Sequence, residues 1–263
     1  MISYANVWPI YHMLRQEADC SSYTFIEGVP SDLNRRLRDG EIDISPSSSI
    51  ELLRSPDVYD LIENHSISSN GPVGSILLFS RRPLEALSGE VVLMSSQSET
   101  SVALLQIIFR KFYGLDCGFR QTAEPIERAL KSHAAYLLIG DDALTEALKW
   151  PHLHVYDLGD LWTEHTGLPF TYALWLVRKE SRADKEELIR QFTGDLDRAR
   201  DSALVNFRRI AAASPYSSLF PLDGLVKYWE GISYELGIRH KEGFDLFRQY
   251  AEELGLIRPL SSP

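Results

Sequence analysis

Two nearly continuous apolar segments constrain the fold of this 263-residue chain more than any other feature. Residues 75–80 and 171–177 are typical of strands covered on both faces, because strands with one wet face alternate between apolar and polar residues. Between them lies a stretch with predicted strands of its own, at residues 91–94 and 134–139. We therefore predict an α/β fold in which the two segments lead into and out of an inserted domain.

The predicted fold has two lobes. Residues 82–169 form the inserted lobe, and residues 1–81 and 170–263 together form the other. Each lobe is expected to hold a mixed sheet flanked by helices, with a cleft between the lobes at the carboxyl ends of parallel strands. The last third of the chain is expected to be helical, since apolar residues recur at threes and fours from Ile189 to Ile210.

Shorter signals predict the remaining elements of the first lobe. Residues 2–4 are typical of the tail of a strand, and the turn at residues 6–9 leads into a helix. Residues 23–27 and 42–45 are expected to be strands, and Pro30 opens a further helix between them.

Charge and cysteine usage exclude several classes of partner. The chain has 27 Lys and Arg against 37 Asp and Glu, a formal charge of −10, so we expect no nucleic-acid partner. No apolar run approaches the ~20 residues that span a bilayer, so no membrane partner is expected. The N-terminus has no signal-peptide pattern, and Cys20 and Cys117 are isolated thiols, which favours the cytoplasm.

The familiar metal and cofactor motifs are missing from the sequence. His152 and His154 offer two ligands, but no third follows at a suitable spacing, which favours a structural role. Gly71-x-x-Gly74-Ser75 leads into a strand rather than out of one, unlike the nucleophile elbow of hydrolases. No glycine-rich phosphate loop occurs. We predict no metal site and no cofactor.

Two hydroxyl-rich turns are the strongest candidates for ligand binding. One contains Ser98, Thr100 and Ser101, and the other contains Ser47 and Ser48. A helix start offers unpaired N–H groups and a partial positive charge, so the two turns could together hold a small dicarboxylate.

Simple helix capping is the alternative explanation of the same turns. Ser96 and Glu99 fit a capping box, and composition alone favours this explanation. Asp141 and Asp142 follow a buried strand, where one of them is expected to cap the next helix. Asn6 either shapes the turn after the first strand or points into the cleft.

Several short motifs, taken in chain order, resemble one protein family. They are Ser3-Tyr4-x-Asn6-x-x-Pro9, Gly40-Glu41-Ile42-Asp43, Ser98-x-Thr100-Ser101, Ile139-Gly140-Asp141-x-Ala143-Leu144 and Asp157-Leu158-Gly159-x-x-Trp162-x-x-x-Thr166-Gly167-Leu168-Pro169-Phe170. The series resembles the menaquinone-pathway chorismate dehydratases and covers essentially the whole chain. Its tryptophan and Thr-Gly-Leu-Pro-Phe segment is the most specific part.

The resemblance implies a fold like that of type II periplasmic solute-binding proteins, without an export signal. It also implies that chorismate loses water to give 3-[(1-carboxyvinyl)oxy]benzoate, the opening step of the futalosine route to menaquinone. The reaction needs no cofactor, and the enolpyruvyl carboxylate of the substrate can serve as the base. The residues that match the family's site are Asn6 at the reacting centre, Asp141 as the acid of the cleft, the carboxylate-binding turn of Ser98, Thr100 and Ser101, and Ser75.

The sequence departs from the family at its N-terminus. Relatives usually carry several residues ahead of the Ser3-Tyr4 pair, which complete a first strand, and Ala5, Val7 and Trp8 are unusual. Two other functions share the implied fold. One is the sister enzyme that releases 1,4-dihydroxy-6-naphthoate, and the other is a binding protein without catalytic activity.

Overall fold

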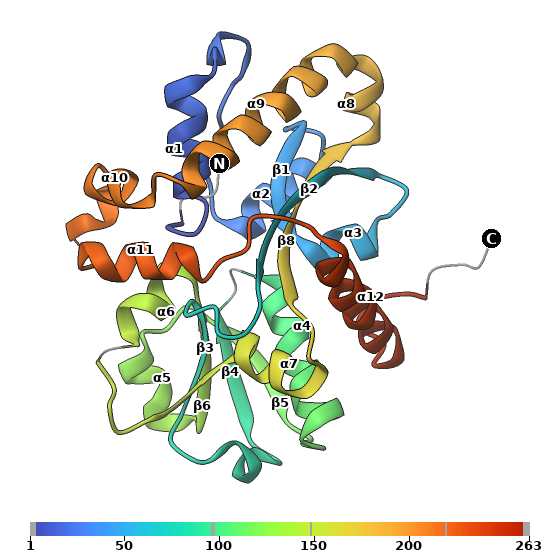
Figure 1. The fold of residues 1–263 in the computed structure, drawn as a ribbon. Coiled ribbons are helices and arrows are strands. Elements are labelled where there is room, and N and C mark those ends of the chain that lie inside the picture. The colour runs from blue at the N-terminus through green and yellow to red at the C-terminus, as the bar shows by residue number, and fades with distance from the viewer. Residues whose placement is uncertain (1–3, 96–97, 148, 219, 260–263) are drawn as a thin grey trace. The chain divides into compact units, whose positions relative to one another are not determined.

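The computed structural model describes residues 4–95, 98–147, 149–218 and 220–259. The chain divides into two compact units, which Figure 1 traces by colour along the sequence. Unit 1 comprises Met1–Ile67 and Ala173–Leu236, and unit 2 comprises Ser68–Tyr172 and Gly237–Pro263. The predicted strand tail at residues 2–4 falls largely outside the described residues.

Helices predominate in unit 1. Its elements are α1 (Trp8–Glu17), η1 (Cys20–Ser22), α2 (Pro30–Arg38), β1 (Ile44–Ser48), α3 (Ser49–Arg54), most of β2 (Tyr59–Ser69), most of β8 (Phe170–Arg178), α8 (Lys179–Asp184), α9 (Glu186–Leu204), α10 (Phe207–Ala212), η4 (Pro215–Ser218) and α11 (Leu222–Glu230). The strands form a three-stranded sheet in the order β1-β8-β2, in which β1 and β8 are antiparallel.

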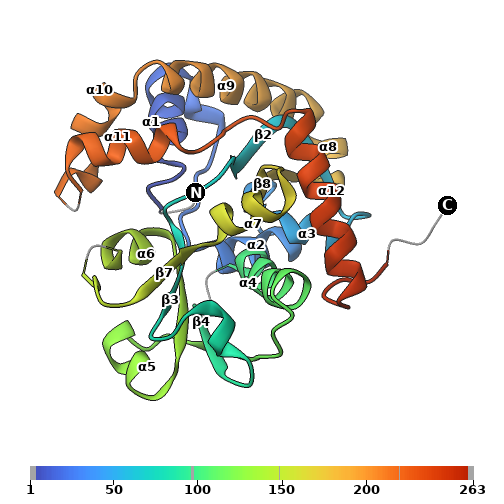
Figure 2. The same ribbon diagram turned by 60° about the horizontal axis from the view of Figure 1, so that its bottom comes forward.

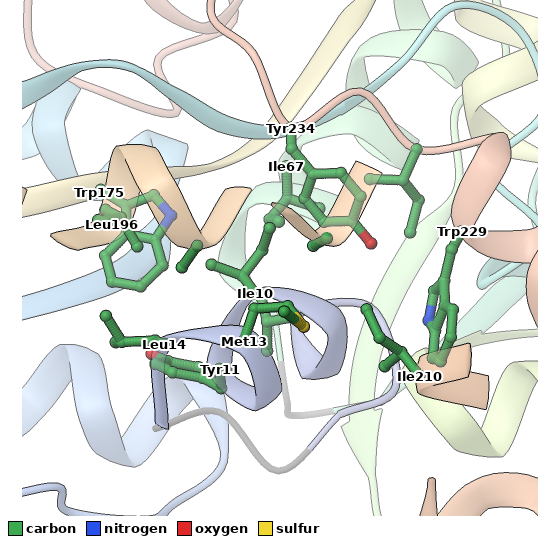
Figure 3. Close-up of a cluster of buried hydrophobic side chains, with 14 of the residues drawn as sticks. Ile10, Tyr11, Met13, Leu14, Ile67, Trp175, Leu196, Ile210, Trp229 and Tyr234 are labelled. Atoms are coloured by element: carbon green, nitrogen blue, oxygen red, sulfur yellow. The ribbon is translucent and has the colours of Figure 1, made fainter. Parts of the chain in front are cut away.

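The core of unit 1 lies between α1, α9 and the sheet. Helix α1 packs along α9, and Figure 3 shows Ile10 and Leu14 of α1 among Leu196 of α9 and Trp175 of β8. The predicted apolar stripe is confirmed, because its α9 members are buried. The stripe is divided between two helices, since α9 ends at Leu204 and α10 begins three residues later.

Two strand predictions in unit 1 can be compared with the structure. Residues 23–27 are assigned to no strand in the described part of the chain. The strand predicted at residues 42–45 is β1, which continues through Ser48. Ser47 and Ser48 are the last residues of this strand, where they pair with Leu174 and Ala173 of β8, and Ser48 is also the N-cap residue of α3.

Unit 2 is built on a five-stranded mixed sheet. Its elements are β3 (Ile76–Ser80), η2 (Leu84–Leu87), β4 (Val91–Ser95), α4 (Glu99–Ile107), the π-helical turn η3 (Ile108–Phe112), β5 (Gly118–Thr122), α5 (Ile126–Ser132), β6 (Ala135–Ile139), α6 (Gly140–Glu146), β7 (His154–Asp157), α7 (Leu158–Thr166) and α12 (Ile238–Glu253). The strand order is β5-β4-β6-β3-β7. Strand β4 is parallel to β5 and β6, whereas β3 is antiparallel to β6 and β7.

The observed division of the chain differs from the predicted lobes of residues 82–169 and the remainder. The chain passes between units within β2, within β8 and after Leu236. The segment at residues 75–80, expected to connect the lobes, instead contains β3 (Ile76–Ser80), which lies inside the sheet of unit 2 with β6 and β7 on its two sides. The C-terminal helix α12 packs against α4 of unit 2 rather than joining the first lobe (Figure 2).

Unit 2 has one sheet edge at which several strand ends meet. The parallel strands β4, β5 and β6 end there, at Ser95, Thr122 and Ile139. Antiparallel β3 begins at the same edge, since Ile76 pairs with Ile139. Helices α4 and α6 therefore start side by side at this edge. Across the described ranges, no helix is both long and apolar enough to cross a membrane.

Candidate functional site

The sheet edge of unit 2 brings together three of the sequence-predicted site segments. The Gly140 N–H donates to the Ser75 carbonyl at 2.8 Å, which places Ser75 beside the first turn of α6 and Asp141. Gly140 has φ +63°, a conformation that a residue with a side chain rarely adopts. The Ser98 turn follows the neighbouring strand β4, so all three segments line the same edge.

The Ser98 turn is a helix cap of well-defined geometry. Ser98 is the N-cap residue of α4, and its Oγ accepts from the Ser101 N–H at 3.3 Å and lies 3.0 Å from the Ser101 Oγ. Thr100 and Ser101 are buried. The structure does not test the predicted capping box of Ser96 and Glu99, because Ser96 lies outside the described residues. The start of an α-helix carries N–H groups that have no partner within the helix, and the Ser98 hydroxyl takes up one of them, that of Ser101.

Asp141 lies within the first turn of α6. Ile139 occupies the N-cap position, so the expectation that Asp141 or Asp142 is the N-cap residue of α6 is wrong. Both carboxylates lie instead in the first turn of α6.

Asp157 anchors the loop that leads to Ser75, a role not predicted from the sequence. Its carboxylate accepts from the N–H groups of Val73 (3.1 Å), Gly74 (2.6 Å), Gly159 (2.8 Å) and Asp160 (3.3 Å). Burial raises the pKa of Asp157 above its ordinary value, while the four N–H groups act in the opposite direction. This carboxylate fixes the start of β3 and caps α7 at once.

An acidic cavity of about 280 Å³ opens at the same edge of the sheet. It is lined by Ser95 and Thr122 together with the carboxylates of Glu124, Asp142 and Glu146. These carboxylates would disfavour an anionic ligand in this cavity. Among the described residues no group of three or more His, Cys, Asp or Glu could hold a metal ion.

Asn6 of unit 1 lies in a turn held firmly by the C-terminal part of that unit. The Tyr234 hydroxyl donates to the Asn6 carbonyl at 2.7 Å, and the Trp229 Nε1–H donates to the Ala5 carbonyl at 2.8 Å. The side-chain Oδ1 of Asn6 is buried and has no hydrogen-bond partner among the described residues. The backbone of this turn is therefore fixed, while the side-chain amide is left for another group.

Asn34 is a candidate that sequence reasoning missed. It is fully buried on α2, and its Oδ1 accepts from the Ser48 N–H at 3.4 Å. Its Nδ2 and the Oγ of buried Ser47 have no partner in the part of the chain that the structure describes. The sequence feature that could have identified it is a polar residue on the buried stripe of α2, between Leu33 and Leu37.

Buried side-chain atoms of Asn6, Asn34 and Ser47 lack a hydrogen-bond partner among the described residues, and all three residues belong to unit 1. The Nε1 of Trp8, two residues after Asn6, is also buried without a partner among the described residues. A buried polar group without a hydrogen bond costs about 1–3 kcal/mol, so native proteins keep few of them. A polar ligand that pairs with these groups would recover that cost.

The comparisons with known proteins identify the family. Residues 1–253 match a family described as "Menaquinone biosynthesis". The chain belongs to this family. It is also 33% identical to the chorismate dehydratase of Thermus thermophilus, over 272 aligned residues that cover 96% of this chain and 93% of the relative. The resemblance inferred from the sequence motifs is confirmed.

Solved structures confirm the predicted fold class. A protein from Archaeoglobus fulgidus superposes with a TM-score of 0.79 at 18% identity, covering 98% of this chain and 97% of its own. The periplasmic aliphatic sulphonate binding protein of Escherichia coli gives a TM-score of 0.67 at 14% identity, covering 97% and 86%. The fold of this family member is therefore like that of periplasmic binding proteins.

Proposed function

We propose that this protein is a chorismate dehydratase, which eliminates water from chorismate to give 3-[(1-carboxyvinyl)oxy]benzoate in the futalosine route to menaquinone. The observation that carries the proposal is the 33% identity to the Thermus thermophilus chorismate dehydratase over nearly the full length of both chains. The family match over residues 1–253 supports the same metabolic assignment.

The chemistry suits a site built from neutral hydrogen-bonding groups. The C3 proton of chorismate is vinylogous to the ring carboxylate, so donors around that carboxylate stabilise the charge that develops as the proton leaves. Loss of the C4 hydroxyl then makes the ring aromatic. The enolpyruvyl carboxylate of the substrate takes the C3 proton, and the protein binds, orients and excludes water.

In this proposal the start of α4 binds a substrate carboxylate. Ser98, Thr100 and Ser101 surround N–H groups at the positive end of that helix, and Ser75 lies at the same sheet edge. Asp141 is proposed as the acidic group of the site. In unit 1, Ser47 and Asn34 supply the unpaired hydroxyl and amide that bind polar groups of the substrate.

Asn6 is the proposed catalytic residue. Its unpaired Oδ1 can accept from the C4 hydroxyl, and its Nδ2 can donate to the same oxygen as it departs. Alanine can do neither. The contacts from Tyr234 and Trp229 hold only backbone carbonyls in this turn, so they survive the removal of the Asn6 side chain.

The decisive experiment compares Asn6→Ala with a matched asparagine variant. Asn6→Ala is expected to fold, to bind the product normally and to turn over chorismate about 10²–10³-fold more slowly. The control is Asn206→Ala, because the Asn206 amide donates to the Ser202 carbonyl and has no role in the proposed site. Product is followed by the absorbance of its aromatic ring. An Asn6→Ala enzyme with near-normal turnover would refute the catalytic assignment.

The same assay separates the alternative functions of this fold. If the wild-type protein leaves chorismate unchanged but releases 1,4-dihydroxy-6-naphthoate from cyclic de-hypoxanthine futalosine, it is the sister enzyme. If it binds carboxylates and converts neither compound, it is a binding protein, like the sulphonate-binding structural neighbour in Escherichia coli.

A further inference from the structure

The loop between β2 and β3 has a sequence that permits many backbone conformations. Residues 70–75 are Asn-Gly-Pro-Val-Gly-Ser, and both glycines have positive φ, +104° at Gly71 and +75° at Gly74. Glycine loses more conformational freedom on folding than any other residue, so such a loop takes one conformation only where other groups hold its backbone. Its last residue is Ser75, a proposed substrate contact.

Side chains from neighbouring elements hold the backbone of this loop. The Thr163 hydroxyl accepts from the Gly71 N–H at 2.9 Å, and the Ser69 hydroxyl donates to the Gly71 carbonyl at 2.8 Å. At the other end of the loop, the Asp157 carboxylate accepts from the Gly74 N–H at 2.6 Å. Asp157 therefore holds the residue directly before the end of the loop.

The two oxygens of the Asp157 carboxylate have different partners. Oδ1 accepts from the N–H groups of Gly159 and Asp160, at 2.8 Å and 3.3 Å, and from that of Val73 at 3.1 Å. Oδ2 accepts from the Gly74 N–H. The cap of α7 needs only the bonds to Gly159 and Asp160. The bond between Oδ2 and Gly74 adds nothing to that cap, so it serves the loop alone.

The hold on Gly74 extends to the start of α6. Ser75 follows Gly74 directly, and its carbonyl accepts from the Gly140 N–H at 2.8 Å. The beginning of β3 and the beginning of α6 therefore share a hydrogen bond. A shift of Gly74 would displace Ser75 and disturb the first turn of α6, which carries Asp141.

We propose that Asp157 is a positioning residue, whose Oδ2 sets the place of the Ser75 hydroxyl at the sheet edge of unit 2. The inference rests on the proposed function, because it takes Ser75 to contact a carboxylate of the substrate. Asp157 itself contacts no substrate in this proposal. Its effect on binding passes through Gly74 and Ser75.

The variant Asp157→Asn tests Oδ2 separately from the cap. The amide oxygen can replace Oδ1 and keep its three bonds, whereas the amide nitrogen then faces the Gly74 N–H, and two donors cannot bond to each other. We expect the product to bind about tenfold more weakly, as for one lost hydrogen bond to a charged group. Asp157→Ser is a second variant, because a serine hydroxyl still caps α7 but is too short to hold Gly74. The control is Asp19→Asn, which changes the carboxylate that caps η1 in unit 1 and should leave product binding unchanged.

A double-mutant cycle with Ser75 separates positioning from a purely structural role. Ser75→Ala should also weaken product binding about tenfold, and Asp157→Asn/Ser75→Ala should bind no more weakly than the weaker single variant. Two independent losses would instead multiply to about 100-fold. A multiplied loss in the double variant, or unchanged binding in Asp157→Asn, would overturn the proposal.

Hydrogen exchange without ligand keeps this test distinct from the test of the proposed function. In Asp157→Asn the Gly74 and Gly140 amides should exchange faster than in the wild type, while those of Gly159 and Asp160 stay unchanged because their cap is kept. Unchanged exchange at Gly140 would contradict the proposal even if the wild type converts chorismate. A wild type that neither converts chorismate nor binds the product would refute the proposed function, and exchange at Gly140 would still show whether Asp157 holds this loop.

Discussion

Two glycines inside helices are expected to respond in opposite ways to replacement by alanine. Gly243 of α12 lies close to the segment before β8, whereas Gly194 of α9 does not lie against another segment. A Cβ at Gly243 would lie 2.1 Å from the carbonyl oxygen of Pro169, and the nearest ordinary Cβ contacts begin at 3.4 Å. The two groups would have to separate by about 1.3 Å. In contrast, a Cβ at Gly194 of α9 meets only the Arg198 guanidinium, at 3.6 Å.

The magnitudes follow from two competing effects. Alanine in place of glycine in a helix interior stabilises by about 1 kcal/mol, because the unfolded chain loses less backbone freedom. Overpacking costs about 1–3 kcal/mol, and the upper value suits Gly243 because the obstacle is a backbone carbonyl. We therefore expect Gly243→Ala to destabilise by about 2 kcal/mol and Gly194→Ala to stabilise by about 1 kcal/mol.

Urea unfolding of the two variants measures these two changes in the free energy of unfolding. At roughly 2–4 °C for each kcal/mol, the two melting temperatures should also move apart by about 6–12 °C. Faster hydrogen exchange in α12 of Gly243→Ala would locate the damage, since Phe247 and Ala251 of that helix are buried. If both variants gain stability, then α12 does not pack on Pro169 as the structure shows.

Two further predictions concern buried ionisable groups. Burial lowers the pKa of His65, so below about pH 6.5 the unfolded chain binds a proton more readily than the native one. Stability should therefore fall as the pH is lowered from about 7.5 to 5.5, and His65→Gln should flatten this dependence in urea titrations. Arg38 donates two 2.9 Å hydrogen bonds to Glu51, whose carboxylate is 1% exposed. Arg38→Met should cost about 2–3 kcal/mol, and the double variant Arg38→Met/Glu51→Leu should recover most of it. Equal losses in both would contradict a penalty from a buried carboxylate that keeps the Tyr59 hydroxyl but has lost its guanidinium partner.

The sequence by itself determined the features that depend only on residues close together along the chain. Pro30 opens α2, the Ser98 hydroxyl caps α4, and Gly140 supplies the left-handed residue after β6. Each rests on local backbone geometry, which a few consecutive residues specify. The family also follows from short motifs, since such motifs report local constraints that relatives share.

The candidate site was predictable in part. Sequence reasoning selected Asn6 as a candidate, and the structure adds that its Oδ1 is buried without a partner among the described residues. It did not find Asn34, because the burial of that amide depends on the packing of α2 against β1. A helix pattern shows which face is apolar, but it does not show which element covers that face.

Only the tertiary structure decided how the segments are assigned to the two units. Residues 75–80 are apolar because β3 lies inside a sheet with strands on both sides, and a strand connecting two domains gives the same pattern. Strand β2, which does pass between the units, has polar residues in its middle and gave no strong signal. Hydrophobicity along a chain records how much of a residue is covered. The identity of the covering element is fixed by contacts between residues far apart in sequence, and local patterns do not encode those contacts.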